Sequence, residues 1–204
     1  MNRSALFILL LLIISASSFN LQVRPLLSSN SRSIARSRKF VLRSSSDSDP
    51  APFPDRLLSI LPYVLPLSDG AEFGKYIYER FPTLGAIERF TVLPITSLFN
   101  SIPFSSLIIF IGLSFLSRSQ SLPRYIRFNI QQALLLDIAL IFPALFGGAA
   151  DNLPREIVEP ATNFVFYGFA ASILYVVGWN LGRGEEPREI PIVSQAAEQQ
   201  IGPF

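Results

Sequence analysis

Two residue types are missing from this 204-residue sequence, which contains neither cysteine nor histidine. Their absence excludes disulfide bonds, metal sites built on cysteine or histidine, cysteine nucleophiles and any Ser-His-Asp triad. Charged residues are also scarce, at 16% of the chain, whereas half of the residues are hydrophobic. Because ordinary soluble domains are more charged, the sequence predicts one small membrane domain. It shows no catalytic constellation, so we expect neither an enzyme nor a bound metal or cofactor.

Acidic residues are missing from the first 46 positions, which hold seven basic residues. The remaining 158 residues hold the other ten basic residues and all fifteen acidic ones. The basic character of the chain therefore belongs to its N-terminal segment. No basic patch typical of nucleic-acid binding accompanies it, so nucleic acid is not an expected partner.

The N-terminal segment predicts two targeting signals in series. Residues 1–18 resemble a secretory signal peptide, with Arg3, a short apolar core and then small residues. Residues 19–50 contain the arginine- and serine-rich, acid-free composition of a transit peptide, followed by a proline-rich linker. A retained signal anchor and a disordered basic linker are the alternatives. The order of the two segments resembles the bipartite presequence of plastids bounded by extra membranes, and the junction Ala16-Ser17-Ser18-Phe19 resembles the cleavage motif of red-lineage secondary plastids.

The rest of the chain predicts an all-α, polytopic membrane domain over residues 51–182, followed by a polar C-terminal tail over residues 183–204. About 20 apolar residues in a helix cross a hydrocarbon core. Four apolar segments predict a small four-helix transmembrane bundle, with spans at about 56–70, 103–117, 128–148 and 161–182. Residues 71–81 have the spacing of an interfacial amphipathic helix, with a solvated connecting helix as the alternative. The first segment is short and contains two prolines, so a re-entrant or interfacial helix is its alternative.

The loops between these spans differ in charge. The loop over residues 118–127 carries Arg118, Arg124 and Arg127 and no acid, whereas the loop over residues 151–160 is acidic. The positive-inside rule places the arginine-rich loop on the cis side. Four spans would place both termini on that side as well.

The third predicted span contains one acid, Asp137, in its middle. A carboxylate is costly in hydrocarbon, so Asp137 should face protein or water. Ala133, Ala144 and Gly148 fall within about 60° of it on a helical projection, which makes a face of small residues. Such faces let helices approach closely. The fourth span has Gly178 and Gly182 at the same kind of spacing, so we expect the two spans to pack together.

Two interpretations of Asp137 remain open. In the structural one it is hydrogen-bonded to Asn163, Tyr167 or Tyr175 of the fourth span. In the functional one it lines a polar pathway through the bundle. Asn129 and Gln132, at the entrance of the third span, either line a polar vestibule or anchor the helix.

Several short motifs together resemble the Tic20 family, membrane components of the protein translocon at the inner envelope of plastids. They are Tyr63-Val64-Leu65-Pro66-Leu67, Ile102-Pro103-Phe104, the stretch RYIRFNIQQALLLDIA over residues 124–139, and Ile190-Pro191-Ile192-Val193 in the tail. The resemblance covers roughly residues 56–201. It implies four spans with termini toward the stroma, and a subunit that helps move preproteins into the stroma, near or lining the channel.

The partners that the resemblance implies are other translocon subunits, transiting preproteins and the lipid bilayer, with a homo-oligomer left open. The implied location is the inner envelope membrane of a plastid, which the presequence assigns to a secondary plastid. A small multi-pass solute or ion transporter of a plastid membrane is the alternative. Inverted repeats would support it, and the halves of the chain show no convincing similarity. A purely structural assembly subunit is the third hypothesis.

Overall fold

The computed structural model describes residues 50–150 and 153–201, apart from the side chains of residues 100 and 148–150. Every regular element in this part of the chain is helical, which confirms the predicted all-α class. The predicted signal and transit peptides lie in residues 1–49, outside the described residues.

Among the described residues, two helices are long and apolar enough to cross a membrane. They are α8, Arg124–Ala150, with 27 residues, and α9, Arg155–Gly182, with 28 residues. At about 1.5 Å per residue each is about 40 Å long, more than the roughly 30 Å of a hydrocarbon core. Helix α8 contains the predicted third span, and α9 contains the fourth. Each helix begins several residues before its predicted span, because the charged residues before the apolar run are also helical.

The first predicted span is a broken helix. It consists of α2, Phe53–Ile60, the 3-10 helix η1, Leu61–Tyr63, and α3, Val64–Gly70. Pro62 lies in η1, where its missing amide hydrogen interrupts the α-helical bonding pattern. Tyr63, which lies in this interruption, has its side chain against α8.

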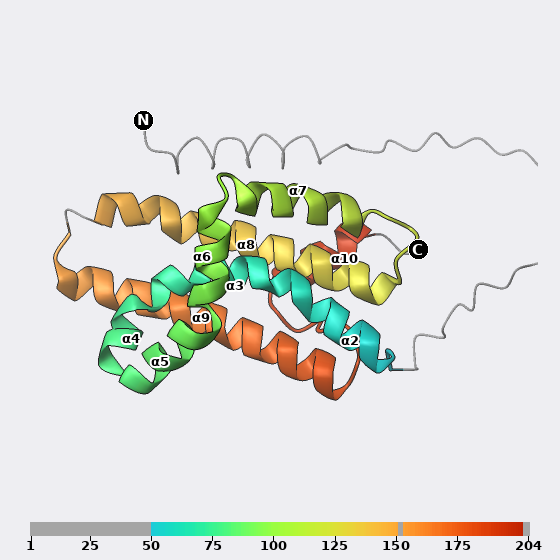
Figure 1. The fold of residues 1–204 in the computed structure, drawn as a ribbon, viewed down its shortest axis with the longest axis horizontal. Coiled ribbons are helices and arrows are strands. Elements are labelled where there is room, and N and C mark those ends of the chain that lie inside the picture. Colours follow the sequence, from blue (N-terminus) through green and yellow to red (C-terminus); the bar gives the residue numbers. More distant parts are fainter. Residues whose placement is uncertain (1–49, 151–152, 202–204) are drawn as a thin grey trace, which may run out of the picture. The chain divides into compact units, whose positions relative to one another are not determined.

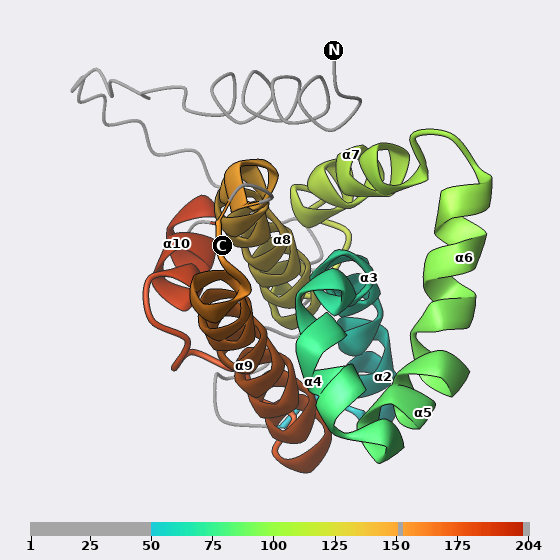
Figure 2. The same cartoon turned by 90° about the vertical axis from the view of Figure 1, so that its left-hand side faces the viewer.

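The second predicted span is shorter than expected. Helix α7, Ser105–Ser117, has 13 residues, or about 20 Å of helix. Pro103, the first residue of the predicted span, lies outside α7, because Phe104 has a left-handed backbone with φ of 62° and the helix begins after it. The preceding helix α6, Leu93–Ser101, runs crosswise to α7, α8 and α9 (Figures 1 and 2).

The predicted interfacial helix is also divided. The 3-10 helix η2, Ala71–Gly74, leads into α4, Lys75–Arg80, and α5, Pro82–Thr91, follows it. Phe81 leaves the helical conformation between α4 and α5, and Pro82 starts α5. Proline suits this first helical position because the first amide of a helix has no partner within it.

Helix α8 lies at the centre of the described residues. It contacts α2, η1, α3, α7, α9 and α10, and its side chains Phe128, Ile130 and Leu134 are buried. Ala133 is fully buried and lies in a cluster with Tyr63, Leu136, Val176 and Ile190. Its small side chain allows segments from three parts of the chain to meet on one side of α8.

The C-terminal segment, residues 183–201, is more than the expected polar tail. Its last part forms α10, Val193–Ile201, which packs on α8. Ser194, Ala197 and Ile201 lie on one face of α10 and are buried, and Ala197 and Ile201 contact Phe128. The mostly polar composition hid this narrow apolar stripe.

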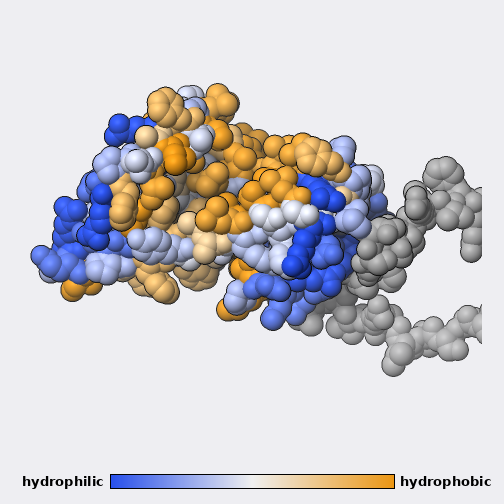
Figure 3. All heavy atoms as spheres, turned by 90° about the horizontal axis from the view of Figure 1, so that it is seen from below, coloured by the Kyte–Doolittle hydropathy of each residue, from blue (hydrophilic) through white to orange (hydrophobic). Residues whose placement is uncertain are grey.

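The outer surface fits a membrane environment. In the view of Figure 3, hydrophobic residues predominate in the middle and hydrophilic residues gather toward the two ends. On α9, Phe164 is 81% and Leu174 is 73% exposed. Large apolar side chains this exposed are costly in water and favourable in lipid.

Candidate functional site

The start of α8 lies at the end of the domain where α2 also begins and where α7 and α9 end. We call this the arginine end. The amide of Ala51 donates to Gly184 O at 2.8 Å, and Arg56 Nη1 donates to Leu181 O at 3.1 Å. Arg127 Nε donates to Ser117 O at 3.1 Å. These three contacts join the start of α2 to the end of α9, and the start of α8 to the end of α7.

A polar face follows the first turns of α8 at this end. Tyr125, Asn129 and Gln132 occupy positions i, i+4 and i+7, which share one side of a helix. Asn129 and Gln132 are 0% exposed. Buried amides are costly unless they are hydrogen-bonded, so their partners decide whether this face is stable.

The partners of this face come from η1 and α9. The Tyr63 hydroxyl donates to Gln132 Oε1 at 2.6 Å, with Asn129 Oδ1 3.1 Å away. Asn180 Nδ2 donates to Asn129 Oδ1 at 2.7 Å, and the Tyr125 hydroxyl donates to Asn180 Oδ1 at 2.5 Å. Hydrogen bonds thus fix the broken first helix, α8 and α9 relative to one another.

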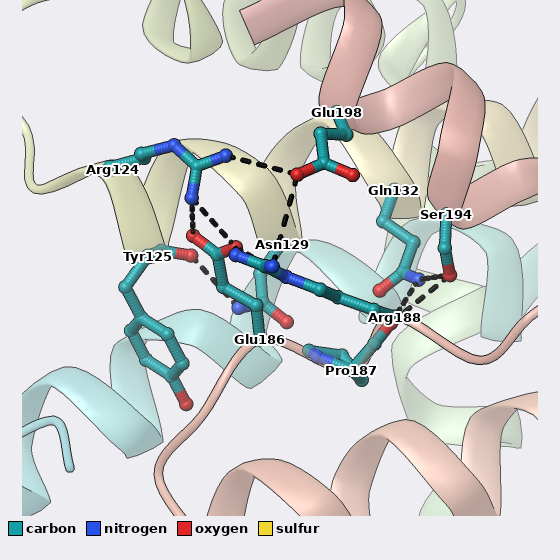
Figure 4. A network of polar contacts seen from close by, with 9 residues as sticks. All are labelled: Arg124, Tyr125, Asn129, Gln132, Glu186, Pro187, Arg188, Ser194 and Glu198. Carbon is teal, nitrogen blue, oxygen red and sulfur yellow. Dashed lines mark hydrogen bonds and ion pairs between the residues drawn. The ribbon is translucent and has the colours of Figure 1, made fainter. Parts of the chain in front are cut away.

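Gln132 extends these bonds into the C-terminal segment, as Figure 4 shows. Its Nε2 donates to Pro187 O at 2.8 Å and to Ser194 Oγ at 2.7 Å. Ser194 Oγ in turn accepts from the Ile190 amide at 3.1 Å and donates to Pro187 O at 3.1 Å. We call the six residues Tyr63, Tyr125, Asn129, Gln132, Asn180 and Ser194 the polar network.

Ion pairs beside the polar network hold the same segment to α8. Arg124 Nη1 lies 2.9 Å from Glu186 Oε1, and Arg124 Nη2 lies 3.5 Å from Glu198 Oε1. Arg188 Nη2 is 2.7 Å from Glu186 Oε2 (Figure 4). The Glu186 side chain is 10% exposed, whereas its neighbour Glu185 is exposed.

The three predicted loop arginines have different surroundings. Arg127 is 8% exposed, and its Nη2 donates to Ile201 O at 2.9 Å. Arg124 is partly buried by its ion pairs, and Arg118 is exposed. Two of the three therefore bind the C-terminal segment to α8.

Gly184 makes the turn into the C-terminal segment. Its φ is +68°, and its amide donates to Asn180 O at 3.1 Å, as at helix ends closed by a left-handed glycine. A Cβ atom at Gly184 would come within 2.5 Å of Arg56 Nε. The Gly-x-Gly pattern of residues 182–184 therefore ends a helix.

Asp137 is 6% exposed and lies beside Asp69 of α3. The expected partners on α9, Asn163, Tyr167 and Tyr175, are not its hydrogen-bond partners. Among the described residues, Asp137 Oδ1 is buried without a hydrogen-bond partner. The carboxyl group of Asp137 thus faces another acid of the same chain and stands apart from the polar network.

The predicted packing of α9 on α8 through glycines differs from the observed arrangement. Gly178 and Gly182 are exposed, and a Cβ atom at either would meet nothing within 4 Å. On α8, Ala133 is buried but Ala144 is exposed, and the surroundings of Gly148 lie outside the described part. The two helices meet where Asn180 donates to Asn129, at the arginine end, and where Val176 packs with Ala133 and Leu136.

Sequence reasoning identified Asn129 and Gln132 but missed Tyr63, Tyr125, Asn180 and Ser194. Of these four, Asn180 gave the clearest sequence signal, because an amide near the end of an apolar span needs a hydrogen-bond partner when it is buried. Within the described residues, no three acidic side chains come together in a way that could hold a metal ion. The hydrogen bonds of this arrangement position the helices.

Comparison with known proteins assigns the family. The chain matches a family model described as "Chloroplast import apparatus Tic20-like" over residues 27–197. "Protein TIC 20-v, chloroplastic" of Arabidopsis thaliana is 33% identical over 170 residues, 81% of this chain and 79% of that protein. "Protein TIC 20-II, chloroplastic" of the same plant is 29% identical over 171 residues, 80% of each chain. A "Tic20 family protein" of Synechocystis sp. is 35% identical over 155 residues, 72% of this chain and 92% of that protein. The chain described here belongs to the Tic20 family.

Proposed function

We propose that this chain is a non-enzymatic subunit of the protein-import translocon in the inner envelope membrane of plastids, where it helps move preproteins into the stroma. The observation that carries this proposal is the family match, which covers residues 27–197. The matched family is described as part of the chloroplast import apparatus. Its partners are then other translocon subunits, transiting preproteins and the surrounding lipid.

In this proposal the chain crosses the membrane four times, through α2 to α3, α7, α8 and α9. The hydrogen bond between Ala51 and Gly184 supports an even number of crossings, because it holds the two ends of the domain together. The arginine end carries Arg118, Arg124 and Arg127. By the positive-inside rule this end faces the stroma.

The polar network supports a positioning role for the start of α8. Asn129 and Gln132 are fully buried within a single chain, so they do not line an open passage in this arrangement. Asp137 is the residue that favours a channel-lining role, because its Oδ1 has no hydrogen-bond partner among the described residues. We propose that the network fixes the helices and that Asp137 alone faces the preprotein pathway when the helices separate.

Depletion and replacement test the main proposal. Import of a radiolabelled preprotein into the stroma should fall when the chain is depleted from plastids and return when the wild-type chain is supplied. Unchanged import together with lost flux of one solute would support the transporter alternative. Supplying the Gly178→Leu variant instead of the wild type tests the hypothesis of a purely structural assembly subunit. That hypothesis expects the translocon complex to dissociate.

Site-specific photocrosslinking tests the channel-lining role. A photoreactive amino acid at Asp137 should capture a preprotein arrested during import. Leu174 is the matched lipid-facing control, because it is 73% exposed on α9. Leu135 of α8 is unsuitable as a lipid-facing control because it packs against Phe128 and α10. Capture at Leu174 but not at Asp137 would contradict the role of Asp137.

A bipartite presequence and a secondary plastid complete the proposal. The family match begins at residue 27, so the predicted signal peptide over residues 1–18 precedes it. N-terminal sequencing of the chain from purified plastids tests this. A mature form that begins between residues 19 and 56 would support it, and a form that retains Arg3 would contradict it.

A further inference from the structure

An apolar groove lies on the side of α8 away from the C-terminal segment. It has a volume of about 370 Å³ and is bounded by α2 to α3, α6, α7 and α8. All of its lining residues are apolar, among them Leu61, Leu65, Phe99, Leu113, Leu122 and Ile130. The groove does not overlap the polar network, and the described fold leaves it unfilled.

The rim of the groove is exposed. Leu61 is 61%, Leu58 is 45% and Leu116 is 44% exposed. The groove therefore opens onto the outer apolar surface of the domain, where hydrocarbon surrounds a membrane protein. An occupant can enter it sideways from the bilayer.

One end of the groove carries positive charge. The lining residues Leu116 and Leu122 are joined by a short loop that contains Arg118, Ser119 and Ser121 and no acid. Arg118 is exposed. Guanidinium groups bind phosphate well, because their planar donors match its oxygens. Ile126 and Ile130 lie in the first turns of α8, so this part of the groove is near the arginine end.

The lining selects against a peptide. A polypeptide segment in an extended form would bring backbone amides and carbonyls into a groove without a polar side chain. Unpaired backbone groups cost several kcal/mol each away from water. A hydrocarbon chain has no such groups and matches the lining.

We propose that this groove binds one acyl chain of an anionic phospholipid, whose phosphate lies at Arg118. The proposal requires that the domain lies in a membrane and does not depend on a role in import. It assigns the 118–121 loop a ligand, and it makes the lipid part of the contact between α7 and the broken first helix.

Native mass spectrometry of the purified full chain tests the proposal. The probes are 1-palmitoyl-2-oleoyl phosphatidylglycerol and the phosphatidylcholine with the same acyl chains, supplied in equal amounts in nanodiscs. The retained lipid should contain at least about fivefold more phosphatidylglycerol than phosphatidylcholine. Arg118→Gln should bring this ratio close to one, and Leu113→Trp should reduce total retained lipid about fivefold by filling the groove.

Leu174→Trp, on the exposed face of α9, is the matched control and should retain lipid like the wild type. Ile109→Phe serves as a second groove variant if Leu113→Trp lowers the helix content measured by circular dichroism. Equal retention of the two lipids by the wild type would overturn the proposal. So would undiminished retention by a folded groove variant, or a photocrosslink from Leu113 to a second copy of the chain.

Discussion

The two ends of the domain hold their helices together in different ways. At the arginine end, Asn129, Gln132 and Asn180 are 0% exposed. Asn180 of α9 donates to Asn129, and Gln132 bonds to Tyr63 of η1 and to Pro187 of the C-terminal segment. At the other end, which we call the acidic end, exposed ion pairs join α4 to the start of α9. There Arg155 Nη2 lies 3.3 Å from Glu79 Oε2, with side chains 64% and 65% exposed.

The contacts of the acidic end are numerous but individually weak. Arg80 Nη2 lies 3.1 Å from Glu159 Oε1, and the Arg155 guanidinium stands 5.0 Å from the centre of the Tyr76 ring. Exposed ion pairs are worth about 0–1 kcal/mol and are screened by salt. A buried hydrogen bond behaves differently, because removing one partner strands the other at a cost of about 1–3 kcal/mol. We therefore expect the arginine end to be the more rigid of the two.

The largest effect is expected for Gln132→Leu. This change leaves the Tyr63 hydroxyl, Pro187 O and Ser194 without their bonds to Gln132. We expect the free energy of unfolding to fall by about 3 kcal/mol. Denaturant unfolding followed by the fluorescence of Trp179, the only tryptophan, measures it.

Gln131→Leu is the matched control for this comparison. Gln131 is half-buried and bonds to Gln200 at the surface, so the loss should stay below about 1 kcal/mol. Equal losses for the two variants would show that burial of the network does not contribute to stability.

An intermediate effect is expected for the Arg124–Glu186 pair. A double-mutant cycle with Arg124→Gln and Glu186→Gln should give a coupling of about 1 kcal/mol, because Glu186 is nearly buried while Arg124 stays 27% exposed. The two single variants should also increase protease cleavage within residues 185–192. A coupling of zero would mean that this ion pair does not contribute to holding the C-terminal segment on α8.

A smaller effect is expected at the acidic end. Raising the salt concentration from about 0.05 M to about 0.5 M screens exposed charges, and Arg155→Gln removes the central one. Both changes should accelerate amide hydrogen exchange more in α4 than in α10, because α10 also packs on Phe128 through Ala197 and Ile201. An equal or larger acceleration in α10 under the same conditions would contradict the difference between the two ends.

The smallest effect is expected for Gly178→Leu. A Cβ atom there would meet nothing within 4 Å, and glycine is a poor helix former. The stability of the isolated domain should change by less than about 0.5 kcal/mol. A loss above about 1 kcal/mol, measured in the same unfolding experiment, would restore the predicted packing of α9 on α8.

These regions also differ in how far the sequence could predict them. Apolar runs predicted α8 and α9 because hydrophobicity over 20 residues is a local property. The return of residues 183–201 onto α8 was missed, since the partners of Gln132 and Arg124 lie more than 50 residues away. The same distance hid Asp69 as the neighbour of Asp137. A glycine spacing shows that another helix can approach closely, but it does not show which helix does so. The spacing of Gly178 and Gly182 therefore did not predict how α9 packs on α8.

The central claim is that the C-terminal segment is a built-in part of the membrane domain, docked on α8 at the arginine end. The chain has no cysteine, so Gln131→Cys with Gln200→Cys creates a single possible cross-link, and Gln131→Cys with Gln199→Cys is its control on another face of α10. In intact membranes, a short bifunctional thiol reagent should join residues 131 and 200 within one chain in high yield and residues 131 and 199 poorly. Equal, low yields for both pairs would contradict the account.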